Sequence, residues 1–396
     1  MAISRKMRDF VANGSMIRKM FEEGKRLKAI YGDDAVFDFS IGNPDLPVPQ
    51  AIKARLKAVV EADDGDLHAY MPNAGLPEAR AAIAARLNRD QGLSLEGAQV
   101  VVTCGAAGAL NIAFKALLEP GDEVLVSSPY FVEYGFIADN HGGVLKTIPA
   151  LPDFSLDVSA LEAAMGPKTK VVLVNTPNNP TGRIYSAESL ARLAVAMERK
   201  GREHGHTIYL VSDEPYRRLA YDGAKVPSPM ASYANSIIAS SFSKDLSLPG
   251  ERLGYTAVNP AAEDSGEIVA ALGLANRILG FVNAPSLMQK VIAGLGDECV
   301  DVAIYERRRD KFVASLRAAG YELGLPEGAF YLFAKIPDGD DEAFLSLLKE
   351  ENILVVPGSG FGAPGYFRVA YCVDDKVIEG ALPGFERAMR RSRALA

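Results

Sequence analysis

The stretch Val171-Val172-Leu173-Val174-Asn175-Thr176-Pro177-Asn178-Asn179-Pro180-Thr181-Gly182 joins an apolar run to a polar turn. Four consecutive apolar residues, with no polar residue alternating between them, are typical of a strand buried on both faces of a parallel sheet. The Asn, Pro and Gly residues that follow favour a turn, and Asn179 is held extended because it precedes Pro180. The segment therefore predicts a buried parallel strand that ends in a polar loop.

Similar apolar runs recur along the chain, separated by helical patterns such as residues 187–203. We expect strands at residues 100–104, 123–127, 144–148, 171–175, 208–213, 236–241 and 254–258. This alternation predicts an α/β fold with a mostly parallel seven-stranded sheet covered by helices on both faces. Ligands bind beyond the carboxyl ends of such strands, which is where Gly105, Asn179 and Asp213 occur.

A lysine follows one of the predicted strands, in Ser241-Phe242-Ser243-Lys244. A buried ammonium group is costly unless it is paired. A neutral lysine nitrogen bonded to carbon, as in a Schiff base with an aldehyde cofactor, avoids that cost. The alternative is that Lys244 begins an exposed loop and points into water, and the tetrapeptide alone leaves both interpretations open.

Three other segments could complete a site for pyridoxal 5'-phosphate. Residues 100–110 predict a strand, a glycine turn and a helix that extends to about Leu118, and small residues at the helix start let backbone N–H groups approach a phosphate. Packing alone would also explain such a turn. An ionised Asp213 could keep the cofactor's ring nitrogen protonated, which makes the ring an electron sink. Tyr216 and Asn179 could reach the ring's phenolate oxygen. In isolation, Asp213 could equally be a helix cap.

In this order the segments resemble the class I/II aminotransferases of the pyridoxal-phosphate superfamily that includes aspartate aminotransferase. The resemblance covers nearly the whole chain and rests on Gly42-Asn43-Pro44-Asp45, Tyr70 with Gly75 and Arg80, the Gly105 turn, Pro129-Tyr130-Phe131, Asn179-Pro180-Thr181-Gly182, Asp213-Glu214-Pro215-Tyr216, Ser241-Phe242-Ser243-Lys244, Arg252 and Tyr366-Phe367-Arg368-Val369-Ala370. It implies a two-stage Schiff-base transfer of the amino group from an L-amino acid to a 2-oxo acid, 2-oxoglutarate or pyruvate.

The resemblance also implies which residues hold the cofactor. Lys244 would bind it and then move the proton, with Asp213 and Tyr216 as the other catalytic residues. The implied cofactor-binding residues are Lys244, Gly105, Ala106, Ala107, Phe131, Asn179, Asp213, Tyr216, Ser241, Arg252 and Tyr70. Within this set Ser241 and Arg252 would bind the phosphate, and Phe131 would stack on the ring, with Tyr130 as the alternative.

The implied substrate-binding residues are Gly42, Asn179 and Arg368. Arg368 would bind the α-carboxylate, a task suited to a planar guanidinium group. Tyr70 would reach the phosphate of a neighbouring subunit, which implies an obligate homodimer with sites shared across the interface. Arg277 and Arg18 are candidates for reading a dicarboxylate side chain, and a helix-surface role is the alternative for both. Asn43, Leu46 and Glu133 depart from the pattern of many relatives, which leaves the substrate side chain open.

Two rival functions use the same scaffold. A carbon–sulfur β-lyase has the same lysine and electron sink, so no residue here separates it from an aminotransferase. Non-enzymatic regulators of this superfamily carry an N-terminal DNA-binding domain. In this chain the site-bearing segments begin at Gly42, so we do not expect a regulator.

Composition narrows the partners and the compartment. The net charge of −7 gives no reason to expect a nucleic-acid partner. Three scattered cysteines do not form a disulfide framework, and four histidines fit no metal-ligand spacing, so we expect no metal. No secretory signal or membrane-spanning apolar stretch stands out. We therefore expect a cytoplasmic protein without a membrane partner.

The length of 396 residues allows more than one domain. We expect a large cofactor-binding domain at residues 46–285. A smaller α+β domain would combine residues 286–396 with an N-terminal segment, residues 1–45, that includes an amphipathic helix at 15–30. In the C-terminal part we expect one long helix at 289–317 and strands near 330–334, 353–356 and 366–370. The glycine-rich loop 358–362 either serves domain closure or is a plain surface loop.

Overall fold

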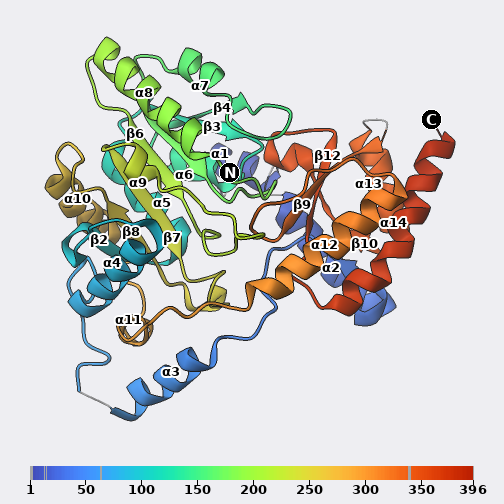
Figure 1. Ribbon diagram of the computed structural model, residues 1–396, viewed down its shortest axis with the longest axis horizontal. Coiled ribbons are helices and arrows are strands. Elements are labelled where there is room, and N and C mark those ends of the chain that lie inside the picture. Colours follow the sequence, from blue (N-terminus) through green and yellow to red (C-terminus); the bar gives the residue numbers. More distant parts are fainter. Residues whose placement is uncertain (1–2, 13, 15, 63–64, 338–339, 396) are drawn as a thin grey trace.

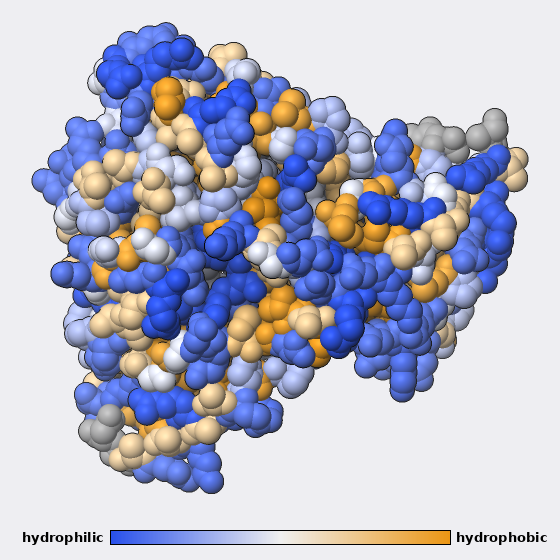
Figure 2. All heavy atoms as spheres, viewed as in Figure 1, coloured by the Kyte–Doolittle hydropathy of each residue, from blue (hydrophilic) through white to orange (hydrophobic). Residues whose placement is uncertain are grey.

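The computed structural model describes residues 3–12, 14, 16–62, 65–337 and 340–395. Figure 1 shows two parts of unequal size, a larger one built around a twisted sheet and a smaller one that carries the C-terminal helix. On the face drawn in Figure 2, hydrophobic side chains gather mainly near the middle of the molecule, and hydrophilic side chains dominate the outer helices. No described helix is both long and apolar enough to cross a membrane.

The large sheet has seven strands in the order β2-β8-β7-β6-β5-β3-β4. Their bounds are Val100–Thr103 (β2), Glu123–Ser128 (β3), Val144–Pro149 (β4), Thr169–Asn175 (β5), Tyr209–Asp213 (β6), Ser236–Ser241 (β7) and Gly254–Val258 (β8). The neighbouring strands β7, β6, β5, β3 and β4 pair in parallel, whereas β8 runs antiparallel to both β7 and β2. This confirms the mostly parallel seven-stranded sheet, with strand ends within two residues of the predicted positions.

Helices cover both faces of this sheet, as expected for strands that are apolar on both sides. In β5, Val171 and Leu173 pack with one hydrophobic cluster and Val172 and Val174 with another. The helices of this part are α3 (Gln50–Ala62), α4 (Pro77–Gln91), α5 (Gly105–Leu117), α6 (Glu133–Asn140), α7 (Val158–Ala164), α8 (Ala187–His204), α9 (Pro229–Ser232), α10 (Ser265–Ile278) and α11 (Ser286–Ala293).

The smaller part contains two short sheets. Strands β11 (Val356–Pro357), β12 (Tyr366–Ala370) and β9 (Tyr331–Lys335) form an antiparallel sheet in that order. Strand β1 (Phe37–Asp38) pairs in parallel with β10 (Ile353–Leu354), so the N-terminal segment joins the C-terminal one. The helices here are α2 (Met16–Tyr31), α12 (Val302–Ala319), α13 (Asp341–Glu350) and α14 (Asp375–Leu395). An aromatic core containing Phe39, Phe312 and Phe385 joins these elements.

One expectation for this region is wrong. The single helix predicted at 289–317 is two helices, α11 and α12, because tertiary hydrogen bonds hold the segment between them. There the backbone oxygen of Glu298 accepts from Arg218, and the Asp301 carboxylate caps α12. The glycine-rich loop contains a short 3-10 helix, η5 (Gly358–Phe361), with the Phe361 ring fully buried.

The N-terminal helix was not named in the sequence expectations. Helix α1 (Arg5–Ala12) packs against α6 through Phe10 and Phe136, whose ring centroids are 4.9 Å apart, and through an ion pair between Lys6 and Asp139. The next helix, α2, contacts β11 in the smaller part. The N-terminal segment therefore touches both parts of the molecule.

Candidate active site

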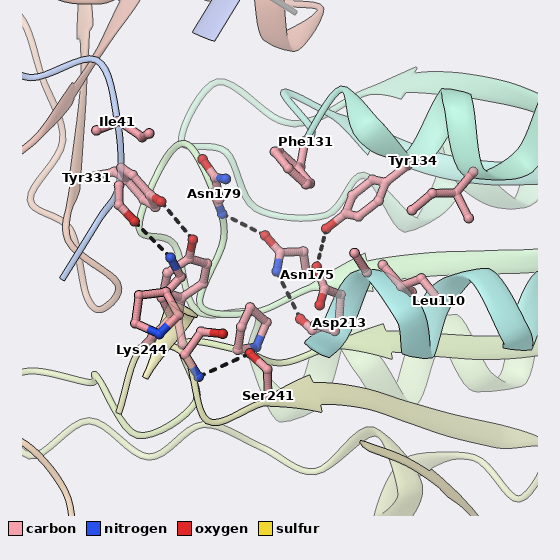
Figure 3. Close-up of a pocket in the computed structure, with 18 of the residues that line it drawn as sticks. Ile41, Leu110, Phe131, Tyr134, Asn175, Asn179, Asp213, Ser241, Lys244 and Tyr331 are labelled. Carbon is pink, nitrogen blue, oxygen red and sulfur yellow. Dashed lines mark hydrogen bonds between the residues drawn. The ribbon is translucent and has the colours of Figure 1, made fainter. Parts of the chain in front are cut away.

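A cavity of about 290 Å³ lies where the carboxyl ends of β5, β6 and β7 meet β9 and β12 (Figure 3). The predicted site residues that line it are Gly42, Ala106, Ala107, Phe131, Asn179, Asp213, Tyr216, Ser241, Lys244, Arg252 and Arg368. These residues come from segments more than 300 positions apart in the chain. The fold thus brings together nearly all of the residues selected from the sequence.

Some selected residues lie elsewhere. Gly105 begins α5 beside the cavity, and Tyr130 is absent from the lining whereas its neighbour Phe131 is present. Tyr70 is 97% exposed and does not reach the cavity of its own chain. Arg277 is exposed on α10 and does not line the cavity either. The side chain of Arg18 lies outside the described residues.

Lys244 follows β7 and extends toward the segment that contains Gly42. Its Nζ donates to the backbone oxygen of Gly42 at 2.8 Å and lies 5.5 Å from the centre of the Phe330 ring. Desolvation by these surroundings, together with the charges of the nearby Arg368 and Arg252 guanidinium groups, lowers the pKa of Lys244 to about 8. Roughly a tenth of this amine is therefore neutral and nucleophilic at pH 7.

Asp213 ends β6 and is only 5% exposed. Its Oδ2 accepts from the Tyr134 hydroxyl at 2.6 Å, whereas its Oδ1 is buried without a hydrogen-bond partner. Burial raises the pKa of Asp213 to about 7, the bond from Tyr134 opposes this rise, and the charge of Glu214 adds to it. The carboxylate is therefore ready to accept a hydrogen bond from a group inside the cavity.

The sequence reasoning missed several residues at this site, among them Tyr134, Asn175, Tyr331 and Ser40. Asn175 ends β5, and its side chain donates to the Asp213 backbone oxygen at 2.9 Å and accepts from the Asn179 backbone N–H at 2.7 Å. A polar residue at the end of an apolar strand was the available signal for Asn175. For Tyr134, which follows Phe131 by three residues, only the docking of α6 reveals the contact.

The end of the cavity formed by Arg252 and the start of α5 is suited to a phosphate. Arg252, Ser241 and Ser243 line it, together with Ala106 and Ala107 in the first turn of α5. The N-terminus of this helix favours an anion. Gly105 has a φ of +73°, and a Cβ there would lie 2.7 Å from Arg252 Nη2. The positive φ favours glycine here, and the missing Cβ leaves room for the guanidinium group beside the helix start.

Arg368 lies on β12 and is 1% exposed. Its Nη1 donates to Asn179 Oδ1 at 3.0 Å and its Nη2 to the Ser40 backbone oxygen at 2.6 Å. The guanidinium lies 4.5 Å from the centre of the Tyr331 ring and 4.8 Å from that of Phe361. Two of its five N–H groups are used in these bonds, and the buried Nε has no partner. The Arg368 guanidinium is therefore held in one orientation, and it keeps N–H groups that can donate to a ligand.

These features fit pyridoxal 5'-phosphate. The unpartnered Asp213 Oδ1 matches a protonated ring nitrogen, the partly neutral Lys244 matches an aldehyde carbon, and the electropositive end at Arg252 matches a phosphate. Phe131 adds an aromatic face to the cavity. The cavity therefore offers a suitable partner for the ring nitrogen, the aldehyde carbon and the phosphate of the cofactor.

Comparisons with known proteins agree with this site. Residues 34–384 match the family model described as aminotransferase class I and II. A probable aspartate/prephenate aminotransferase of Aquifex aeolicus is 33% identical over 363 residues, which cover 87% of this chain and 89% of that protein. Aromatic-amino-acid aminotransferase 2 of Thermococcus litoralis is 30% identical over 97% of both chains. The crystal structure of an aminotransferase from Eubacterium rectale has 40% identity, covers 99% of each chain and gives a TM-score of 0.95.

Fold and cavity together define an enzyme that uses pyridoxal 5'-phosphate to move amino groups. The chain belongs to the class I and II aminotransferases, which confirms the resemblance drawn from its motifs. It is a pyridoxal-phosphate-dependent aminotransferase that acts on amino acids.

Proposed function

We propose that the enzyme transfers the amino group of an L-amino acid to 2-oxoglutarate or pyruvate in two half-reactions at this cavity. The observation that carries the proposal is that Lys244, Asp213 and Arg368 line one cavity, each with hydrogen-bonding capacity unused. The named substrates of the relatives make aspartate and the aromatic amino acids the first donors to test.

In this proposal four side chains act on the cofactor and the α-carbon. Pyridoxal 5'-phosphate, when bound, supplies a carbonyl carbon for the amine and a ring that withdraws the electron pair left at the α-carbon. Lys244 Nζ would take the proton from the substrate α-carbon, and a pKa of about 8 suits a base that works near neutral pH. The unpartnered Oδ1 of Asp213 would hold the protonated ring nitrogen. Tyr216 and Asn179, which line the same cavity, would donate to the ring oxygen.

Arg368 binds the α-carboxylate in this scheme. Its bonds to Asn179 and Ser40 fix the guanidinium plane before substrate arrives, so little side-chain entropy is lost on binding. Gly42 lies beside it, where a Cβ would overlap the Tyr331 side chain. The same arrangement orients the α-carbon toward Lys244, whose Nζ is bonded to the Gly42 oxygen.

We also propose a homodimer in which Tyr70 completes the phosphate site of the partner subunit. The Tyr70 ring is almost fully exposed, and its loop is joined to α10 by a bond from Asn276 to the Asn73 backbone oxygen. Leu274 and Ile278 are exposed on the same helix and add apolar area near this loop. A second copy would bury that surface. The three free cysteines suit the cytoplasm, which we propose as the compartment.

The test is a visible absorption spectrum of the cofactor-loaded protein while single L-amino acids are added without any 2-oxo acid. We expect one or more donors to convert the cofactor band, and 2-oxoglutarate or pyruvate to reverse the change. The pair of compounds identifies donor and acceptor. A band that persists while ammonia accumulates from cystathionine would instead indicate a carbon–sulfur lyase. A protein that shows no cofactor band after loading would refute the role of Lys244.

A further inference from the structure

Tyr331, the first residue of β9, contacts two functional groups at once. Its hydroxyl lies 2.7 Å from the Tyr216 hydroxyl in a buried pair, and its ring faces the Arg368 guanidinium at 4.5 Å. A Cβ on Gly42 would overlap the Tyr331 hydroxyl, so this glycine leaves the space that the hydroxyl fills. Figure 3 shows Tyr331 beside Lys244 and across the cavity from Phe131.

Core packing alone does not require this hydroxyl. Tyr331 belongs to a large hydrophobic cluster in which a phenylalanine ring would fill nearly the same volume. The two hydroxyls form a chain with a direction, however, because each has one proton to donate. When Tyr216 donates into the cavity, Tyr331 must donate to Tyr216, and donated bonds strengthen one another along such a chain.

We propose that Tyr331 is a positioning residue that orients both Tyr216, which faces the cofactor, and Arg368, which binds the substrate. Its hydroxyl makes Tyr216 a directed donor toward the cofactor's ring oxygen, and its ring fixes the plane of Arg368 for the substrate carboxylate. The inference rests on the proposed roles of Tyr216 and Arg368. It divides into a hydroxyl part and a ring part that can be tested separately.

The surroundings determine what a pH titration will report. The charged and titratable groups that face Tyr216 and Tyr331 are Asp213 at the end of β6, Lys244 after β7, Arg368 on β12 and Cys372 after β12. Neither tyrosine ionises near neutral pH, since burial raises the pKa of Tyr331 to about 12 and that of Tyr216 well above its usual value. A shift in the visible titration caused by Tyr331→Phe is therefore not the loss of an ionising tyrosine.

The experiment compares Tyr331→Phe and Tyr331→Leu in the cofactor-loaded enzyme. Two quantities are measured: the pH midpoint of the visible absorption change without substrate, and inhibition by acetate, a small carboxylate without an amino group. Tyr331→Phe should move the midpoint upward by roughly 0.5 to 1 pH unit, because a weaker Tyr216 donor stabilises the ionised ring oxygen less. Acetate inhibition should stay within about twofold, because the ring over Arg368 remains.

Tyr331→Leu should move the midpoint similarly and also weaken acetate binding by about five- to tenfold, since one of the two aromatic rings that hold Arg368 is lost. Tyr371→Phe is the matched control, because Tyr371 and Tyr221 form another buried hydroxyl pair that does not line the cavity. It should change neither quantity. A midpoint unmoved in Tyr331→Phe overturns the hydroxyl part, and unchanged acetate inhibition in Tyr331→Leu overturns the ring part. A native enzyme without any cofactor band overturns the proposed function as well.

Discussion

The cavity has two walls that are built differently. On the wall formed by the large sheet, Asn175, Asp213 and Ser241 are the last residues of β5, β6 and β7, and Lys244 follows β7 by three residues. On the wall formed by the smaller part, Arg368 lies in the middle of β12, opposite Phe333 in the antiparallel pairing. One wall thus consists of strand ends, and the other of a strand face.

This difference determines how each wall holds its functional groups. Parallel strands end at the same edge of a sheet, so residues at their carboxyl ends are neighbours without further support. Arg368 does not lie at the end of a parallel strand. It is held instead by groups distant in the sequence, the Ser40 backbone oxygen and the Asn179 side chain. We therefore expect changes in the large-sheet wall to affect the chemical step, and changes in the other wall to affect substrate binding.

The largest effect should come from Lys244→Ala, which removes the proposed base from the large-sheet wall. Turnover should fall by roughly 10⁴-fold or more, since both the covalent anchor and the proton transfer are lost. The cofactor should still bind through the phosphate end of the cavity. Steady-state kinetics and cofactor titration measure the two quantities. Lys335→Ala, at the exposed end of β9, is the control and should retain activity. Comparable turnover in Lys244→Ala would place the base elsewhere.

The two walls also differ in how far the sequence predicted them. The seven strands and the groups at their ends were predictable, because apolar runs and turn residues are local signals that the parallel arrangement converts into proximity. Arg368 was identified only by resemblance to a family. Its neighbours Ser40 and Tyr331 were missed, because their contacts join segments about 330 and 115 positions apart. The break between α11 and α12 was missed for the same reason, since tertiary bonds override the local helical pattern.

An intermediate effect is expected from Arg368→Lys on the smaller wall. Lysine keeps the charge but cannot reproduce the planar fork that contacts Asn179, Ser40 and a carboxylate together. The KM for the amino acid should rise by about 10- to 100-fold, which corresponds to one charged hydrogen bond, with a smaller change in kcat. Initial-rate kinetics with the donor found in the spectral test measure both constants.

The control for this variant is Arg309→Lys. Arg309 is also only 1% exposed and lies in the smaller part, but it is paired with Asp222 and does not line the cavity. This change should lower the melting temperature and leave KM unaltered. An equal rise of KM in both variants would mean that Arg368 acts through the stability of the smaller part, and the proposed division between the two walls would fail.

The smallest effect concerns the hydroxyl that α6 adds to the large-sheet wall. Tyr134→Phe removes the donor to Asp213 Oδ2, so the pKa of Asp213, which burial already raises to about 7, should rise by roughly one further unit. Because this pKa is raised above that of the unfolded chain, the stability that Asp213 contributes is present below about pH 4 and is lost as the pH rises through about 7. In the variant this loss continues to higher pH.

The melting temperature of the cofactor-free variant should therefore differ from that of the native protein by a constant amount below about pH 7, and fall further below it as the pH increases from about 7 to 8. Tyr233→Phe is the matched control, because the Tyr233 hydroxyl donates at 2.8 Å to the uncharged backbone oxygen of Ile208. Its stability loss should be the same at every pH. If the Tyr134→Phe difference were equally flat, the hydroxyl would not stabilise the ionised carboxylate. The strand ends would then set the charge of Asp213 on their own, without a contribution from a packed helix.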